Sequence, residues 1–301
     1  MFYLIENLCP IFIIGSHMFK VFGFVTKNNN LTHDEYRAGH VGYHNSFGRR
    51  LNNIRGYTLN VRSNQNITKD YNKSSLVKEI SFNEPNEFDN QWNGYGQLMF
   101  DKFEDYITAK QPALDKAGPN GLELDDMVAK VGDDFEHLYS GSPFQFNVNE
   151  TIIKPVMRRE RKLFKVTQFV KKNEALSEIL FNSYLKGAYS ESLSKMDGLQ
   201  GLIINQRTSL DVMTNFFNPE SECFSKAGVQ RRERFYENWD IIIEYWFNNS
   251  DYFFSSRFNK NLLSFTKKFE EKYLKSSFYR EVDETVAVIP KRDIPTDYYF
   301  R

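Results

Sequence analysis

Cysteine is scarce in this chain, which has only Cys9 and Cys223 among its 301 residues. Two isolated cysteines are too few for a disulfide framework or a thiolate metal site, so we expect a reducing, cytoplasmic location. Net charge is also lacking, because 39 Lys and Arg residues balance 39 Asp and Glu residues. This balance argues against a broad basic surface, so we expect no nucleic-acid partner.

Long apolar runs are missing as well. The chain has no stretch of about 18 apolar residues, so we expect no membrane-spanning helix and no membrane partner. Near the start, the sequence GSHM ends at Met18 and is typical of a cloning remnant. The preceding residues lack the basic region and the small-residue cleavage site of a signal peptide. We therefore interpret residues 1–17 as expression-tag or vector sequence and leave them out of the functional argument.

Aromatic side chains, by contrast, are abundant, with 28 Phe, 17 Tyr and 3 Trp residues. Together with a hydrophobic content of 41%, they are sufficient to build proper cores and to line apolar pockets. At about 100–200 residues per domain, the length suggests two domains.

The chain contains two copies of one pattern. Residues 19–64 align without a gap on residues 164–209, and 12 of the 46 pairs are identical. About three identities are expected from ordinary composition. Two further pairs of blocks agree: FDNQWNGYGQLMFD (88–101) with FYENWDIIIEYWFN (235–248), and VNETIIKP (148–155) with VDETVAVIP (282–290). We therefore divide the chain after residue 17 into two units, 18–156 and 157–301.

Each copy predicts an α+β fold with the order β-α-β-β-α-β of a ferredoxin-like unit. The alternating segments KVFGFV and KVTQFV open the copies as strands, and the Trp-bearing blocks are expected to be the third strands. Thr32 and Glu35 have the spacing of a capping box at the start of the first helix, and Ser177 is the equivalent cap in the second copy. In the first copy, AGPNG (117–121) is expected to break the second helical region.

Three of the five histidines lie within LTHDEYRAGHVGYHN (31–45). An α-helix turns by about 100° per residue, which places His33, His40 and His44 within about 40° of one line. The stripe that should pack on the sheet is Tyr36, His40, Tyr43, Phe47, Leu51 and Ile54. In the second copy the three histidines become Glu178, Leu185 and Tyr189, and no histidine follows His137. The two copies are therefore not expected to perform the same chemistry.

Three interpretations of these histidines stay open. His40 is a hydrogen-bonded core residue, with His33 and His44 at the surface. Alternatively His44, together with His40, is a general acid and base at a pocket between helix and sheet. In the third interpretation His40 and His44 chelate a divalent metal, although no H-E-x-x-H motif is formed and no third ligand is evident.

The segment FVTKNNNLTHDEYRAGHVGYHNSFGRRLNNIRGYTLN resembles the opening of the EthD family, in the dimeric α+β barrel superfamily. The matching residues are Leu31, Thr32, Asp34, Glu35, Tyr36, Arg37, His44, Gly56 and Tyr57, with a later match from Trp92 to Asp101. The histidine of that family is commonly followed by a small residue and proline, whereas this sequence continues as HNSF.

The resemblance implies that the two ferredoxin-like units pair their antiparallel sheets into one α+β barrel. The chain would then be an internal pseudo-dimer, to which a further homodimer could be added. Pockets in this superfamily accept small apolar organic ligands. We therefore expect a cofactor-independent enzyme of the lyase or cyclase type. It would carry out dehydration, aldol cyclisation or isomerisation of a small apolar carbonyl, phenolic or polyketide-like compound.

In this hypothesis His44 transfers a proton, and His40 and Tyr57 are further catalytic candidates. The expected substrate contacts are Phe22, Phe24, Tyr43, Trp92 and Tyr95, for which a plain core role is an equally open interpretation. We expect no metal and no other cofactor. The alternatives are a non-catalytic protein that binds a hydrophobic ligand, and a haem- or metal-binding protein of the oxygenase type that ligates through His40 or His44.

Overall fold

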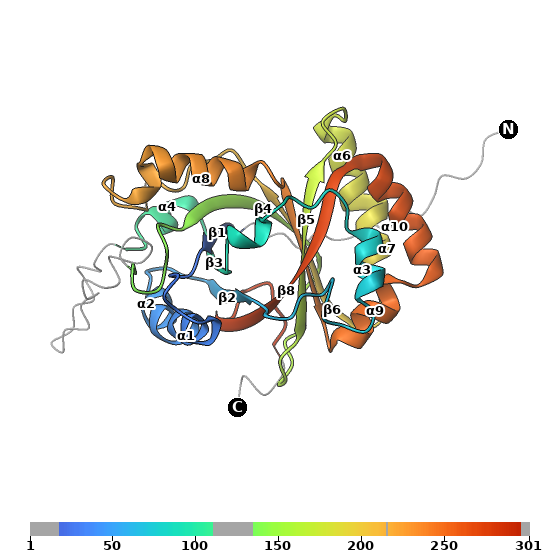
Figure 1. Ribbon diagram of the computed structural model, residues 1–301, viewed down its shortest axis with the longest axis horizontal. Coiled ribbons are helices and arrows are strands. Elements are labelled where there is room, and N and C mark those ends of the chain that lie inside the picture. Colours follow the sequence, from blue (N-terminus) through green and yellow to red (C-terminus); the bar gives the residue numbers. More distant parts are fainter. Residues whose placement is uncertain (1–17, 111–134, 215, 296–301) are drawn as a thin grey trace.

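The computed structural model describes residues 18–110, 135–214 and 216–295. The expected cloning remnant (1–17) and the expected helix break at 117–121 lie outside these residues. Within the described part, eight strands form a closed antiparallel barrel with helices on its outside (Figure 1). None of the helices found there is long and apolar enough to cross a membrane.

The barrel is built from two sets of four strands. The first set is β1 (Phe19–Val25), β2 (Gly56–Arg62), β3 (Gly94–Phe100) and β4 (Phe144–Lys154). The second set is β5 (Phe164–Lys172), β6 (Leu199–Arg207), β7 (Ile241–Phe247) and β8 (Leu274–Val288). Around the barrel the order is β1-β3-β2-β8-β5-β7-β6-β4, so the fourth strand of each set pairs with the second strand of the other set. The expected α+β class, with two ferredoxin-like units joined into a barrel, is confirmed.

Helices connect these strands on the outer face. In the first unit they are α1 (His33–Ala38), the π-helical turn η1 (Gly39–His44), α2 (Asn45–Gly48), α3 (Ser74–Ile80), the 3₁₀ turn η2 (Phe88–Asn90) and α4 (Phe103–Ile107). In the second they are α6 (Glu178–Tyr184), the π-helical turn η3 (Leu185–Tyr189), α7 (Ser190–Ser194), the 3₁₀ turn η4 (Glu222–Phe224), α8 (Lys226–Tyr236), α9 (Ser250–Arg257) and α10 (Lys260–Tyr273).

The two expected helix caps are confirmed. The Glu35 backbone N–H donates to Thr32 Oγ1 at 3.2 Å, and the Thr32 N–H donates to the Glu35 carboxylate at 2.8 Å. In the second unit, the Leu180 N–H donates to Ser177 Oγ. Both helices therefore start where the local spacing of polar residues predicts.

Each unit covers part of the other. Figure 1 shows α3, from the first unit, beside α7 and α9 of the second, whereas α8 lies over the strands of the first unit. Val77 and Ile80 of α3 accordingly belong to the core of the second unit's helical layer. Met213 and Phe216, which precede α8, belong to the core of the first. This exchange adds contacts between the units beyond the two strand seams.

The expectation that the Trp-bearing blocks are the third strands holds only for the second half of each block, because β7 begins only at Ile241 and leaves Trp239 before it. β3 begins only at Gly94, so Trp92 lies in the connection before it, after the 3₁₀ turn that contains Phe88. The rings of Phe88 and Trp92 both pack against Phe169, with centroids 5.0 and 5.7 Å away. The turn before β3 thus places both rings in one buried aromatic cluster with Phe169.

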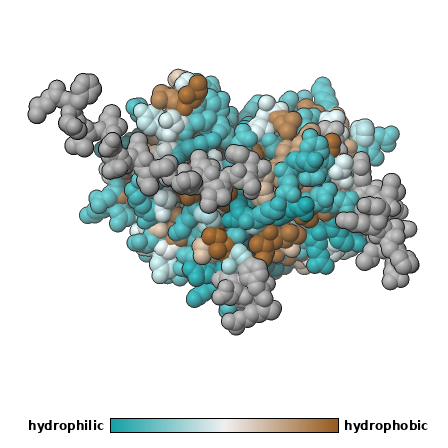
Figure 2. All heavy atoms as spheres, turned by 180° about the vertical axis from the view of Figure 1, so that it is seen from behind, coloured by the Kyte–Doolittle hydropathy of each residue, from teal (hydrophilic) through white to brown (hydrophobic). Residues whose placement is uncertain are grey.

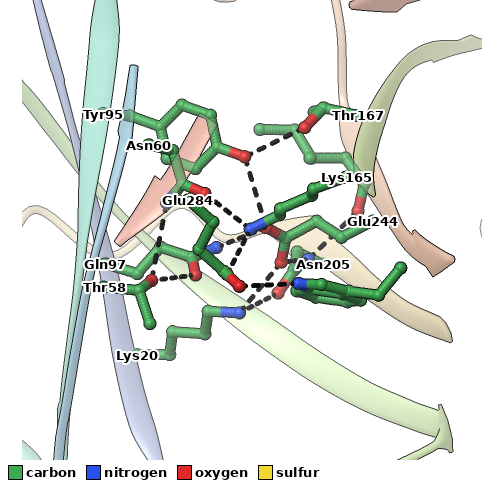
Figure 3. A network of polar contacts seen from close by, with 12 residues as sticks. Lys20, Thr58, Asn60, Tyr95, Gln97, Lys165, Thr167, Asn205, Glu244 and Glu284 are labelled. Atoms are coloured by element: carbon green, nitrogen blue, oxygen red, sulfur yellow. Dashed lines mark hydrogen bonds and ion pairs between the residues drawn. The ribbon is translucent and has the colours of Figure 1, made fainter. Parts of the chain in front are cut away.

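A buried polar network lies inside the barrel (Figure 3). Lys20 and Lys165, at equivalent positions of the two first strands, both contact the Glu244 carboxylate, with N–O distances of 3.3 and 2.7 Å. Each lysine also contacts a glutamate from the fourth strand of its own unit and an asparagine from the second strand of the other unit. These contacts are Lys20 with Glu150 and Asn205, and Lys165 with Glu284 and Asn60. The network thus repeats the two-fold pattern of the chain and spans both units.

Candidate functional site

The histidine segment is not one regular α-helix. Its middle, Gly39–His44, is a π-helical turn, which contains one residue more than an α-helical turn. The buried face therefore runs through Tyr36, His40 and His44 at a spacing of four residues. Tyr43, which we expected on this face and in contact with substrate, is 44% exposed instead. The expected stripe was wrong at this position because the extra residue rotates Tyr43 outward and His44 inward.

Tyr36, His40 and His44 form a stack between helix and sheet. The His40 ring lies 5.4 Å from the Tyr36 ring and 5.6 Å from the His44 ring, with interplanar angles of 17° and 7°. His40 is 1% exposed and His44 8% exposed. The interpretation that placed His44 at the surface is therefore wrong, because both histidines face the layer between helix and sheet.

The segment just before β4 completes this group. Tyr139 Oη lies 2.7 Å from His40 Nδ1, and the Phe135 ring lies 4.7 Å from that of His44. Gly39 permits this close approach, because a Cβ at its position would lie 2.3 Å from Leu138 Cδ2. A side chain at residue 39 would therefore force the Leu138 side chain to move.

Three buried polar atoms of the stack have no hydrogen-bond partner among residues 18–110, 135–214 and 216–295: Tyr36 Oη, His40 Nε2 and His44 Nδ1. Buried polar groups in proteins are nearly always paired, so each exception needs an explanation such as a water, a ligand or a catalytic role. Three exceptions in adjacent rings mark this stack as the candidate site.

Burial sets the protonation of these groups. It lowers the pKa of His44 to about 4, and burial together with the neighbouring His44 lowers the pKa of His40 well below its usual range. Burial also raises the pKa values of Tyr36, Tyr57 and Tyr139 above the usual range. At neutral pH the site therefore holds two neutral imidazoles among protonated tyrosine hydroxyls.

Tyr57, the third catalytic candidate, lies on β2 in the same outer layer as the stack. Its hydroxyl occupies the space beside Gly48, where a Cβ would lie 2.7 Å from Tyr57 Oη. The structure thus brings His40, His44 and Tyr57 to one side of the sheet.

The remaining substrate-contact candidates lie on the other side. Phe22, Phe24, Trp92 and Tyr95 belong to an aromatic core inside the barrel. Tyr95 Oη pairs there with Thr167 Oγ1 at 2.9 Å. The structure therefore does not bring these four side chains together with the histidines.

The fit of a metal or haem can be judged from the donor atoms. Among residues 18–110, 135–214 and 216–295, no three His, Cys, Asp or Glu side chains lie close enough to hold a metal ion. The donor set in the described part therefore does not offer a divalent metal enough ligands. A haem iron needs only one imidazole, and within this stack His40 Nε2 is an unpaired atom that could supply it.

The equivalent place in the second unit is filled differently. Leu185 and Tyr189 replace the two histidines, and Tyr189 Oη donates to Glu270 at 2.7 Å. Glu270 also accepts a hydrogen bond from Arg257 Nη2 at 2.6 Å, in a fully buried ion pair. The second unit thus uses this layer for a paired charge, whereas the first holds neutral rings whose nitrogens are not all paired within the described part of the chain.

Sequence reasoning missed Tyr139, Phe135 and Leu138, which cover the stack. They lie in the irregular segment before β4, where neither helical nor strand periodicity marks them. His137, in the same segment, has an exposed side chain. The glycine at residue 39, next to a histidine within a helix, is the one local sign that something packs closely there.

A surface cleft of about 400 Å³ beside α6 is a second candidate. Its lining is largely charged and partly self-paired, since Gln206 donates to Glu178 at 2.8 Å and Lys171 lies 3.5 Å from Asp240. Figure 2 shows a mainly hydrophilic face with small separate hydrophobic patches. The charged lining of this cleft therefore suits an apolar compound poorly.

No family model matches the sequence, and no curated protein matches it. The resemblance to the EthD family therefore stays a prediction. Among solved structures, a candidate monooxygenase from Fusobacterium nucleatum has a TM-score of 0.52 at 7% identity, over 92% of this chain and 95% of that chain. An anthrone oxidase-like protein has a TM-score of 0.50 at 7% identity, over 91% of this chain and 95% of that chain. At such low identity these similarities show a shared fold, the barrel of two ferredoxin-like units.

Proposed function

We propose that the chain is a cofactor-independent enzyme of the lyase or cyclase type. It would act on a small apolar carbonyl, phenolic or polyketide-like compound, with His44 as acid and base. The observation that supports this most is the pair of buried, stacked imidazoles, each with an unpaired ring nitrogen, that occurs in one unit only. A structural role at these positions is served by Leu185 and Tyr189 in the second unit.

The chemistry follows from the neutral state of His44. As a neutral imidazole it accepts a proton from the carbon next to a carbonyl, which leaves an enolate. With its lowered pKa of about 4, the resulting imidazolium readily returns the proton. Return to a different carbon gives isomerisation, and transfer to a leaving hydroxyl releases water. In both cases the histidine ends the cycle neutral, and no electrons are gained or lost.

The test combines binding and turnover on the full-length protein. A panel of apolar cyclic ketones and phenols is incubated with wild type and His44→Ala, and products are measured by mass spectrometry. We expect turnover to fall by about 10²-fold or more in His44→Ala while ligand affinity is kept. His33→Ala, on the same helix but outside the stack, is the matched control and should keep its turnover. Binding without any turnover in wild type would favour a hydrophobic-ligand-binding protein instead.

An oxygenase is the second candidate, because the two solved structures above are named as a candidate monooxygenase and an anthrone oxidase-like protein. Running the same panel under air and under nitrogen separates the two. A product that gains oxygen only under air supports the oxygenase. An absorption spectrum and metal analysis of the purified protein come first, since a haem Soret band or one metal per chain would overturn the cofactor-independent proposal.

A further inference from the structure

The two ring nitrogens of His40 are in different situations. Nδ1 lies 2.7 Å from Tyr139 Oη, whereas Nε2 is buried and has no partner among the residues that the structure describes. Which nitrogen carries the proton depends on the direction of the bond to Tyr139, and the two directions differ in how many groups they leave unpaired.

If Tyr139 donates to His40 Nδ1, the ring proton is on Nε2, and one buried donor, this Nε2–H, lacks a partner. If His40 Nδ1–H donates to Tyr139 instead, the tyrosine hydroxyl hydrogen and the Nε2 lone pair both lack partners within the described part of the chain. Every unpaired buried polar group is costly, so the first arrangement is favoured. Burial raises the pKa of Tyr139 well above its usual value, so the hydroxyl keeps the proton that it donates.

We infer that Tyr139 is a positioning residue that holds His40 as an Nε2–H donor, and that this donor binds an oxygen acceptor of the substrate, a ketone carbonyl or a phenolate. The inference rests on the proposed function and adds to it the atom that holds the substrate oxygen.

In this arrangement the two stacked histidines have different roles: His40 donates a hydrogen bond to the substrate oxygen, and His44 accepts the proton. A neutral N–H donor in a dry site stabilises negative charge that develops on a carbonyl oxygen when a neighbouring proton is removed. The His44 ring, 5.6 Å away in a parallel stack, is placed to take that proton. The second unit has Leu185 in place of His40 and so lacks the donor.

The tautomer can be observed directly in the full chain labelled with ¹⁵N. Long-range ¹H–¹⁵N correlation spectra distinguish protonated from unprotonated ring nitrogens, and the His40→Leu variant, which copies the second unit, assigns the signals. We expect Nε2 of His40 to be protonated and Nδ1 to be unprotonated at neutral pH. Tyr139→Phe should move the Nδ1 signal and mix the tautomers. Tyr71→Phe is the control. It removes a hydroxyl outside the stack that donates to Glu281 at 2.5 Å, and it should change neither ring-nitrogen signal of His40.

Binding of an oxygen acceptor is tested with a matched pair of probes. 4-Nitrophenolate carries a phenolate oxygen at the position where 4-nitrotoluene carries a methyl group. We expect wild type to prefer 4-nitrophenolate by about tenfold or more, as for a charge-assisted hydrogen bond. The preference should be lost in His40→Leu and should fall several-fold in Tyr139→Phe, while 4-nitrotoluene affinity stays unchanged. A merely structural role of Tyr139 would weaken both probes alike.

The outcomes separate this inference from the proposed function. An Nδ1–H tautomer of His40, or equal or undetectable binding of the two probes, overturns the inference, whatever the turnover assay shows. The expected tautomer and probe preference without turnover on any ketone or phenol would uphold the inference as a binding mode and overturn the proposed enzyme.

Discussion

Gln97 and Glu244 hold equivalent places in the two halves of the barrel, and the Gln97 amide donates a hydrogen bond of 2.7 Å to Glu244 Oε1. Gln97 lies opposite Phe22 and Thr58, and Glu244 lies opposite Thr167 and Ile203, the corresponding residues of the second unit. A hydrogen bond between equivalent residues means that the approximate two-fold axis passes close to this contact. An exact two-fold repeat would place two identical side chains at this axis. This chain has an amide, Gln97, in the first unit and a carboxylate, Glu244, in the second.

The charge of the network explains why the two positions differ. Its buried members comprise four cations and four carboxylates, namely Lys20, Lys165, Arg158 and Arg292 with Glu150, Glu244, Glu284 and Asp293. A second glutamate at position 97 would leave one buried negative charge without a partner, and burying an unpaired charge is costly.

We predict that exchanging the two residues restores what each single substitution loses. Gln97→Glu should lower the free energy of unfolding by roughly 3 kcal/mol through an excess carboxylate, and Glu244→Gln by about 3–5 kcal/mol through two under-compensated lysines. The double variant keeps the charge balance and should recover most of the loss. Urea unfolding of the four proteins measures this. A double variant as unstable as the sum of the single losses would contradict the two-fold account.

The neutral histidines predict a loss of stability in acid. The folded pKa of His44, about 4, lies below the value of about 6.5 in an unfolded chain, so between these values the unfolded state binds more protons. The free energy of unfolding should therefore fall by up to about 3 kcal/mol as the pH drops from 6.5 to 4. Above pH 6.5 this contribution does not change.

Replacing His44 with tyrosine, the residue at the equivalent position 189 of the second unit, tests whether His44 causes this pH dependence. His44→Tyr should flatten the dependence of unfolding free energy on pH between 6.5 and 4. His137→Gln, at an exposed histidine outside the stack, controls for the loss of a histidine elsewhere. An unchanged slope in His44→Tyr would show that His44 is not buried in its neutral form.

Two glycines in the same π-helical turn should respond oppositely to alanine. A Cβ on Gly39 would lie 2.3 Å from Leu138, whereas one on Gly42 meets nothing within 4 Å. We expect Gly39→Ala to lower the free energy of unfolding by about 1–3 kcal/mol and to separate Tyr139 from His40. Gly42→Ala should be neutral or stabilise by up to about 1 kcal/mol, as in other helices.

Thermal unfolding of both glycine variants provides the comparison. Leu138→Ala should lower the free energy of unfolding less in the Gly39→Ala background than in wild type, because there it also removes the clashing methyl group. Equal effects of the two alanines would mean that residues 135–139 do not pack on the helix as described.

The buried ion pair of the second unit predicts a fourth result. Glu270→Gln leaves the Arg257 guanidinium buried without its counter-charge and should cost about 3–5 kcal/mol. The double variant Arg257→Met with Glu270→Leu removes both charges and should cost clearly less. Chemical denaturation compares them. A larger loss in the double variant would show that the pair itself is a net source of stability.

Much of the fold could be predicted from local patterns. The capping box of Thr32 and Glu35 was predictable because a cap depends on residues three positions apart. The repeat predicted two similar units, and several identical pairs, among them Lys20 with Lys165 and Asn60 with Asn205, prove to be members of the barrel network. Sequence equivalence alone did not show that these residues meet.

The candidate site was predictable only in part. The grouping of histidines on one helix was visible in the sequence, but the π-helical turn that buries His44 and exposes Tyr43 was not. Tyr139, the partner of His40, lies 99 residues away in an irregular segment. A contact over that separation is made by the folded chain and leaves no local pattern.

By itself, the sequence determined the number of units, the order of their elements and the fold class, because repeats and periodicity are properties of short segments. Only the tertiary structure decided which face of each strand is enclosed. Alternation places Phe22 and Tyr57 on defined sides of their own strands, but both sides of these strands are buried. Closure of the seams between β2 and β8 and between β4 and β6 puts Phe22 inside the barrel and leaves Tyr57 beside the histidines.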